Sequence, residues 1–317
     1  MSQWGSSILT PRYRLLAMSN NRTLFTRRRL LQYGLGVGVA SILSPSLRAA
    51  APPQPRIAAL EWTAVELIDA VGLQPFAVSD ITSYRQWVVT PSLPDATVEL
   101  GLRNEPNLEL LAQLRPDIII LPYYSPLPEA TLQQFGEVIR YPFTLPGKRI
   151  LTVARDNLQQ LGRHLGREAF AQRTLTHWQE NMTAARQLLA PWLGKRILMY
   201  SFLSPRQVLV MSPSSLFGEV LAYLGLQCAW QGSANMWGSA VIGVEQLYPV
   251  DTDIAIEFMH GERGATRAVP QSGLWQKMPF MQQHNHYQVE GAWMYGGLHA
   301  ALHFTEQLIH LSGQWHD

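Results

Sequence analysis

The fold is decided by residues 56–121, which begin RIAALEW (56–62), continue through GLRNEPNLELL (101–111) and end LRPDIIIL (114–121). The apolar runs at both ends have the length and composition of buried strands. Between them lie helix-period segments punctuated by proline. This alternation of strands and helices predicts an α/β lobe built on a buried sheet.

The chain is long enough for two such lobes, since 317 residues exceed one ordinary domain. Residues 168–190 contain no proline or glycine, and their apolar side chains recur mostly every three or four positions, as in a long helix. We therefore predict an N-terminal α/β lobe at 52–166, an interlobe helix at 167–190 and a C-terminal α/β lobe at 191–317. On the residues alone, a peripheral helix of one lobe is the alternative.

Local signals place most of the remaining elements. Thr63 is expected to cap a first helix at 63–71, and Gly225 to end a helix at 216–224. Further helices are expected at 107–114 and 297–311. Strands are expected at 57–60, 76–78, 118–121, 196–202, 208–210 and 254–258.

The first 51 residues differ from the rest in charge. They hold seven arginines and no acidic residue, whereas the remainder holds 18 basic and 23 acidic side chains. The basic character of the whole chain therefore belongs to this leader, and a nucleic-acid-binding function loses its main support.

The leader itself predicts export. TRRRLL (26–31) fits a twin-arginine signal, and a short apolar run is followed by small residues suited to cleavage near 49–51. No cysteine lies there for lipid attachment, so we expect a periplasmic protein. An uncleaved anchor is the alternative, and either Met1 or Met18 is the start. The lone Cys228 is expected to be a buried small side chain.

Large aromatic residues gather at predicted strand ends and in loops of both lobes, where rings facing a ligand are common. The alternative is that each ring fills the core. The residues concerned are Trp62, Tyr84, Trp87, Tyr123, Tyr124, Trp230, Trp237, Trp293 and Tyr295.

Arg103 lies in a loop of the deciding stretch, between Leu102 and Pro106. Its guanidinium keeps its charge and offers planar donors suited to polarised oxygens. A salt bridge to Glu99 or Glu105 is the alternative.

A helix carrying His299, His303 and Glu306 would place these three side chains on one face, the spacing of some metal sites. This allows a metal-dependent hydrolase, although packing explains the histidines equally well. The chain has neither a G-x-S-x-G elbow nor a phosphate-binding glycine loop, and this argues against the hypothesis that it is an enzyme.

Two further segments, AWQGSANMWGS (229–239) and AWMYG (292–296), complete a pattern that covers residues 55–311. It resembles the class III periplasmic substrate-binding proteins of iron-siderophore ABC importers, and among them the ferric-hydroxamate (ferrichrome-type) binders. The resemblance implies two α/β lobes joined by one long rigid helix, a ligand held between them and no enzymatic activity.

The resemblance also assigns the site. It implies that Arg103 and Tyr124 contact hydroxamate oxygens, with Tyr123 as the fallback for Tyr124. Phe202 replaces an aliphatic residue and is expected to reshape the site. The other implied ligand contacts are Trp62, Trp87, Trp230, Asn235, Trp237, Ser239, Trp293, Met294 and Tyr295.

The charge of this site favours a particular cargo. A ferric trihydroxamate is neutral, which suits one arginine among rings better than a trianionic catecholate complex does. The siderophore saturates its iron, so the protein needs no metal ligand or cofactor of its own. Haem, cobalamin or a catecholate complex remain alternative ligands.

Glu129 and Glu245 each begin a predicted helix, where acidic residues are common. The resemblance implies that they meet arginines of the inner-membrane permease. We expect the protein to act as a monomer with no nucleic-acid partner.

Overall fold

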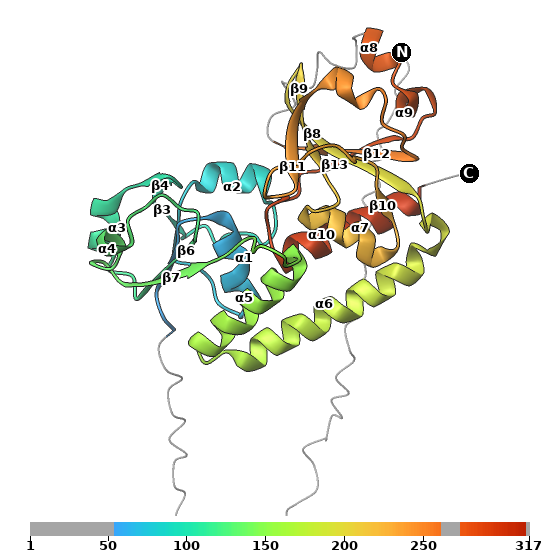
Figure 1. Ribbon diagram of the computed structural model, residues 1–317. Helices are drawn as coiled ribbons and strands as arrows, with labels where there is room; N and C mark the ends of the chain where they lie inside the picture. The colour runs from blue at the N-terminus through green and yellow to red at the C-terminus, as the bar shows by residue number, and fades with distance from the viewer. Residues whose placement is uncertain (1–53, 261–272, 315–317) are drawn as a thin grey trace, which may run out of the picture. The chain divides into compact units, whose positions relative to one another are not determined.

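The computed structural model describes residues 54–260 and 273–314, and the predicted signal segment lies outside them (Figure 1). The described chain contains two large β-sheets flanked by helices, one with strands from residues 57–141 and one with strands from residues 196–290. This agrees with the predicted fold class. The exact domain boundaries at 51, 166 and 190 stay a prediction.

The N-terminal sheet has the order β3-β2-β1-β6-β7, and its neighbouring strands are all parallel. Its central strands are buried on both faces, which explains their unbroken apolar sequence. The strands are β1 (Ile57–Ala59), β2 (Ala77–Val78), β3 (Val98–Glu99), β6 (Ile118–Pro122) and β7 (Glu137–Tyr141).

Helices and one small hairpin connect these strands. The hairpin pairs β4 (Gly101–Leu102) with β5 (Glu105–Pro106). The helices are α1 (Trp62–Ala70), α2 (Ile81–Trp87), α3 (Leu108–Leu114) and α4 (Glu129–Leu132).

Two helices lead from the first sheet to the second, α5 (Ile150–His164) and the longer α6 (Glu168–Leu188) (Figure 1). The α6 helix packs against α5, α7 and α10, and a 3-10 turn, η1 (Ala190–Trp192), follows it. The predicted long helix therefore exists, and it ends two residues earlier than expected, because Pro191 in the turn that follows cannot continue an α-helix.

The C-terminal sheet has the order β11-β9-β8-β12-β13, with β10 pairing the start of β8. Its strands are β8 (Arg196–Ser204), β9 (Gln207–Met211), β10 (Gln227–Cys228), β11 (Ser239–Gly243), β12 (Ile254–Met259) and β13 (His286–Glu290). The helical segments are α7 (Leu216–Leu224), η2 (Val244–Leu247), α8 (Gly273–Gln276), α9 (Pro279–Gln282) and α10 (Leu298–Ser312).

The ends of two helices test the predictions made from single capping residues. The helix at 216–224 ends as predicted, with Gly225 in the left-handed conformation at φ +82°. The predicted cap of the first helix is wrong, because Glu61 rather than Thr63 caps α1 and accepts from the Thr63 backbone N–H. Within the described residues, no helix is long and apolar enough to cross a bilayer.

Candidate functional site

Arg103 follows β4, and its guanidinium is held on three sides. Its Nη1 lies 3.2 Å from Glu61 Oε1 and its Nε lies 3.6 Å from Asp80 Oδ2. Its central carbon stacks 3.6 Å from the centroid of the Trp62 ring, with Trp293 at 5.7 Å. Stacking of this kind suits a guanidinium and adds to the ion pairs.

The partners of Arg103 correct one expectation. A salt bridge to Glu99 or Glu105 was the alternative, but the described acidic partners of the guanidinium are Glu61 and Asp80. Glu99 instead accepts the backbone N–H groups of Asp80, Ile81 and Gly101, so it orders the loop that presents Asp80. Glu99 therefore supports the site indirectly, by holding the loop that carries Asp80.

Aromatic rings from distant parts of the chain form a continuous cluster beside Arg103. Tyr124 lies 5.8 Å from Trp237, and Trp237 lies 6.1 Å from Tyr295. Tyr295 is 5.3 Å from Trp293, which is 4.8 Å from Trp62. The contacts are edge-to-face, the favoured geometry for aromatic pairs. Five residues predicted at the site are therefore brought together.

The 235–239 loop holds its part of the cluster through hydrogen bonds. The Asn235 side-chain oxygen accepts the backbone N–H groups of Trp237 and Ser239, and the Ser239 hydroxyl lies 3.0 Å from the Tyr295 hydroxyl. Gly238 has φ +75°, and a Cβ there would lie 2.2 Å from the Ser215 nitrogen. Only glycine fits there, so Gly238 allows the loop that presents Trp237 to pass close to the backbone of Ser215.

Tyr124 projects from the loop after β6, and Arg140 organises that loop. The Arg140 guanidinium donates to the carbonyl oxygens of Pro122, Ser125 and Leu127. Partial burial, with the nearby charge of Glu61, raises the pKa of the Tyr124 hydroxyl. Tyrosine is already protonated at neutral pH, so this hydroxyl is a hydrogen-bond donor there. Tyr123, its fallback, is more exposed.

Four of the predicted residues lie outside this cluster. Trp87 stacks on His260 at 4.3 Å, and Phe202 packs against Tyr200 and Trp275. Met294 is fully buried, and Trp230 is half-buried with its Nε1 donating to the Ser233 carbonyl. Their predicted contacts with the ligand stay a prediction.

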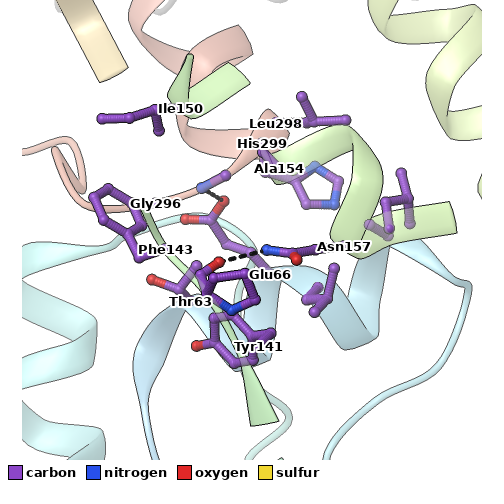
Figure 2. Close-up of a pocket in the computed structure, with 15 residues that line it drawn as sticks. Thr63, Glu66, Tyr141, Phe143, Ile150, Ala154, Asn157, Gly296, Leu298 and His299 are labelled. Carbon is purple, nitrogen blue, oxygen red and sulfur yellow. Dashed lines mark hydrogen bonds between the residues drawn. The ribbon is translucent and has the colours of Figure 1, made fainter. Parts of the chain in front are cut away.

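A small cavity lies among α1, α5 and the segment that leads into α10. Figure 2 shows Glu66, Asn157 and His299 among its lining residues. Its volume is about 30 Å³, against roughly 300–1,000 Å³ for ligand pockets, so it cannot hold a siderophore. Burial raises the pKa of Glu66 to about 7.

The possible metal face on α10 is divided between other contacts. His299 pairs with Asp69 at 3.1 Å, while His303 contacts Gln307. Among the described residues, no group of three histidine, cysteine or acidic side chains is placed to hold a metal. The hydrolase alternative therefore gains no support.

The two predicted docking acids differ in surroundings. Glu129 begins α4 and is half-exposed, with Arg140 Nε 3.1 Å away and Gln133 also donating to it. Glu245 lies in η2 and is exposed. Cys228 is buried, as predicted, and donates to the Met211 carbonyl.

Sequence reasoning missed two acids of the site, Glu61 and Asp80. Glu61 directly follows the apolar run 57–60. An acidic residue at the end of a predicted buried strand could have been recognised from the sequence as a candidate site residue. Asp80 gave no such signal, because its approach to Arg103 depends on the pairing of β2 with β3.

Comparison with known proteins agrees with this architecture. The chain is 34% identical to the iron(3+)-hydroxamate-binding protein FhuD of Escherichia coli (strain K12) over 297 residues, covering 92% of this chain and 97% of the relative. It is 26% identical to the achromobactin-binding periplasmic protein of Dickeya dadantii (strain 3937), covering 92% and 98%.

A solved structure extends the likeness to three dimensions. The Vibrio cholerae siderophore-binding protein FhuD, bound to Fe³⁺-Desferal, superposes with a TM-score of 0.75 at 28% identity, covering 81% of this chain and 98% of that one. The family described as "Periplasmic binding protein" matches residues 57–291, which span both sheets and the helices between them, and the chain is a member of that family.

Proposed function

We propose that this chain is the solute-binding component of an ABC importer, and that it captures ferric hydroxamate siderophores and delivers them to the inner-membrane permease. The observation that carries the proposal is Arg103, half-exposed and stacked on Trp62 beside rings contributed by both halves of the chain. The 34% identity to a hydroxamate-binding relative supports the same ligand class.

The chemistry of the cluster suits a neutral, amphiphilic complex. Arg103 supplies charge-assisted donors for hydroxamate oxygens, and the rings supply apolar surface for the organic shell. Glu61 and Asp80 lie beside Arg103, so the site carries no excess of positive charge for a trianionic catecholate complex. Capture and release of this cargo need no catalytic group and no protein ligand for iron.

We propose that the ligand contacts the rings of the aromatic cluster together with Arg103 and the 235–239 loop. Trp87, Trp230, Met294 and Phe202 would act in support, shaping the walls. The direct contacts would be Trp62, Arg103, Tyr124, Asn235, Trp237, Ser239, Trp293 and Tyr295.

Location and assembly complete the proposal. The protein would be exported through its twin-arginine segment and act in the periplasm as a monomer. Glu129 and Glu245 would dock it on the permease.

Tryptophan fluorescence tests the ligand class directly, because nine of the ten tryptophans lie outside the leader. We expect ferric trihydroxamates to quench it saturably, with affinity that changes little between low and high salt, since a neutral ligand gains little from long-range attraction. Haem, cobalamin and a ferric catecholate belong in the same panel. Tighter binding of any of these three would overturn the assignment.

A further inference from the structure

Glu61 is a buried acid at the centre of the site, and its exposed fraction is only 4%. A buried carboxylate is costly unless hydrogen-bond donors surround it. Glu61 Oε2 accepts from the Thr63 backbone N–H at 2.7 Å and from the Tyr141 hydroxyl at 3.2 Å. These two contacts set the orientation of the carboxylate independently of Arg103.

Arg103 has no comparable anchor in its own segment. It follows the two-residue strand β4, beside the exposed Leu102, and its long side chain would otherwise sample many rotamers. The fixed Glu61 carboxylate accepts a hydrogen bond from Nη1, Asp80 forms an ion pair with the guanidinium at 3.6 Å from Nε, and the Trp62 ring stacks on its flat face. Since Glu61 and Trp62 are consecutive, one short segment holds both the edge and the face of the guanidinium.

We propose that Glu61 is a positioning and specificity-determining residue of the ligand site, acting through Arg103. This inference rests on the proposed function. A guanidinium has five N–H donors. Glu61 accepts one Nη1 hydrogen and Asp80 lies in ion-pair range of Nε, so the second Nη1 hydrogen and both Nη2 hydrogens remain for a ligand. Holding them in place before binding removes part of the ordering cost.

Glu61 also sets the charge of the site. Arg103 alone would present one positive charge, whereas Arg103 with Glu61 and Asp80 presents a net negative charge. An anionic complex gains less from such a site than from an isolated arginine, so the acids disfavour it relative to a neutral complex.

The test compares Glu61→Gln with the wild type, using two ferric trihydroxamates that differ only in a pendant group, one neutral and one bearing a carboxylate. Glutamine keeps the size and accepting oxygen of the side chain but loses the charge. We expect about threefold to tenfold weaker binding of the neutral complex, and a ratio of affinities shifted toward the anionic complex. Unchanged or tighter binding of the neutral complex, with an unchanged ratio, would overturn the inference.

A double-mutant cycle separates positioning from general damage. In an Arg103→Ala background, Glu61→Gln should have no further effect on the affinity for the neutral complex, because the residue through which Glu61 positions that complex is gone. Equal losses in both backgrounds would indicate a purely structural role and overturn the inference. Glu219→Gln, at another buried acid, which accepts the backbone N–H groups of Ile150 and Leu151, is the matched control and should leave the affinity ratio unchanged.

Asp80→Asn keeps the inference testable if Glu61→Gln does not fold. The Asp80 side chain contacts Arg103, while its loop is held by backbone bonds to Glu99. We expect the same change of ratio, smaller in size. Failure of the wild type to bind any hydroxamate would overturn both this inference and the proposed function, whereas normal wild-type binding with an unchanged ratio in the variants would overturn only the inference.

Discussion

Glu66 and Glu219 each cap a helix that belongs to the other half of the chain. Glu66 on α1 accepts the backbone N–H groups of Gly297 and Ala300 at the start of α10, at 2.8 and 3.2 Å. Glu219 on α7 accepts those of Ile150 and Leu151 at the start of α5, at 2.8 and 2.9 Å. Both carboxylates are buried and lie where a helix dipole favours negative charge. Residues associated with the two sheets are therefore tied by reciprocal bonds.

Removing one of these caps should lower stability. We expect Glu219→Ala to reduce the free energy of unfolding by roughly 1–3 kcal/mol, because two buried N–H groups lose their acceptor. Urea denaturation measures this. Glu168→Ala, at an exposed acid in the first turn of α6, is the control and should change it by less than about 0.5 kcal/mol. Equal effects of the two substitutions would contradict a special role for Glu219.

The pKa of Glu66 predicts a pH dependence of stability. Burial raises this pKa from 4.5 to about 7, so between these values the folded protein holds a proton that the unfolded chain has released. Stability from this group is therefore present at pH 4.5 and is lost as the pH rises through 7. Burial lowers the pKa of His299, but Asp69 and Glu66 outweigh it and raise the pKa overall, which acts in the same direction.

Glu66→Gln isolates this effect. Between pH 5 and pH 8 the melting temperature of the wild type should fall more than that of the variant, because the variant lacks both the Glu66 titration and the contribution of Glu66 to the raised pKa of His299. Thermal melts across this range make the comparison. A wild-type curve parallel to that of the variant would show that Glu66 titrates normally.

Rings of the aromatic cluster should differ in how much they contribute to the stability of the fold. Trp237 is half-buried, so Trp237→Ala should weaken hydroxamate binding by about tenfold or more while changing stability little. Trp62 is buried under Arg103 and donates to the Ser79 carbonyl, so Trp62→Ala should cost roughly 3–5 kcal/mol of stability. Fluorescence titration and urea denaturation of both variants decide this. A large stability loss at Trp237 would make it a core residue.

The sequence predicted the fold well wherever the signal was local. The buried strands 57–59 and 118–122 and the helix ending at Gly225 follow from periodicity and one glycine. The cap of α1 was missed because Glu61 reaches into the helix from the residue before it, which a serine or threonine rule does not anticipate.

Long-range partners were beyond sequence reasoning. The alternative role of Arg103 was a salt bridge to Glu99 or Glu105, its neighbours in the chain, yet it pairs with Glu61, which is 42 residues away. Only the register of the first sheet brings these residues together. The same holds for Glu66 and Glu219, whose acidic character alone did not indicate which helix each would cap.

The last prediction concerns delivery to the permease. Exposed acids that match positively charged residues of a partner set docking orientation and association rate rather than ligand affinity. We expect Glu129→Gln combined with Glu245→Gln to impair siderophore uptake by cells strongly, and each single substitution to be intermediate. Affinity for the siderophore in solution should stay near that of the wild type.

Neutralising substitutions suit this test better than charge reversal. Glu129 lies 3.1 Å from Arg140, which organises the loop of Tyr124, so an arginine at 129 would disturb that loop by repulsion. Glu109→Gln with Glu168→Gln, at exposed acids near the starts of α3 and α6, provides the control. Uptake assays and fluorescence titrations of the same variants are compared. Normal uptake by the Glu129 and Glu245 double variant would remove these acids from the docking surface, whereas weakened ligand binding would show that they act on the ligand site.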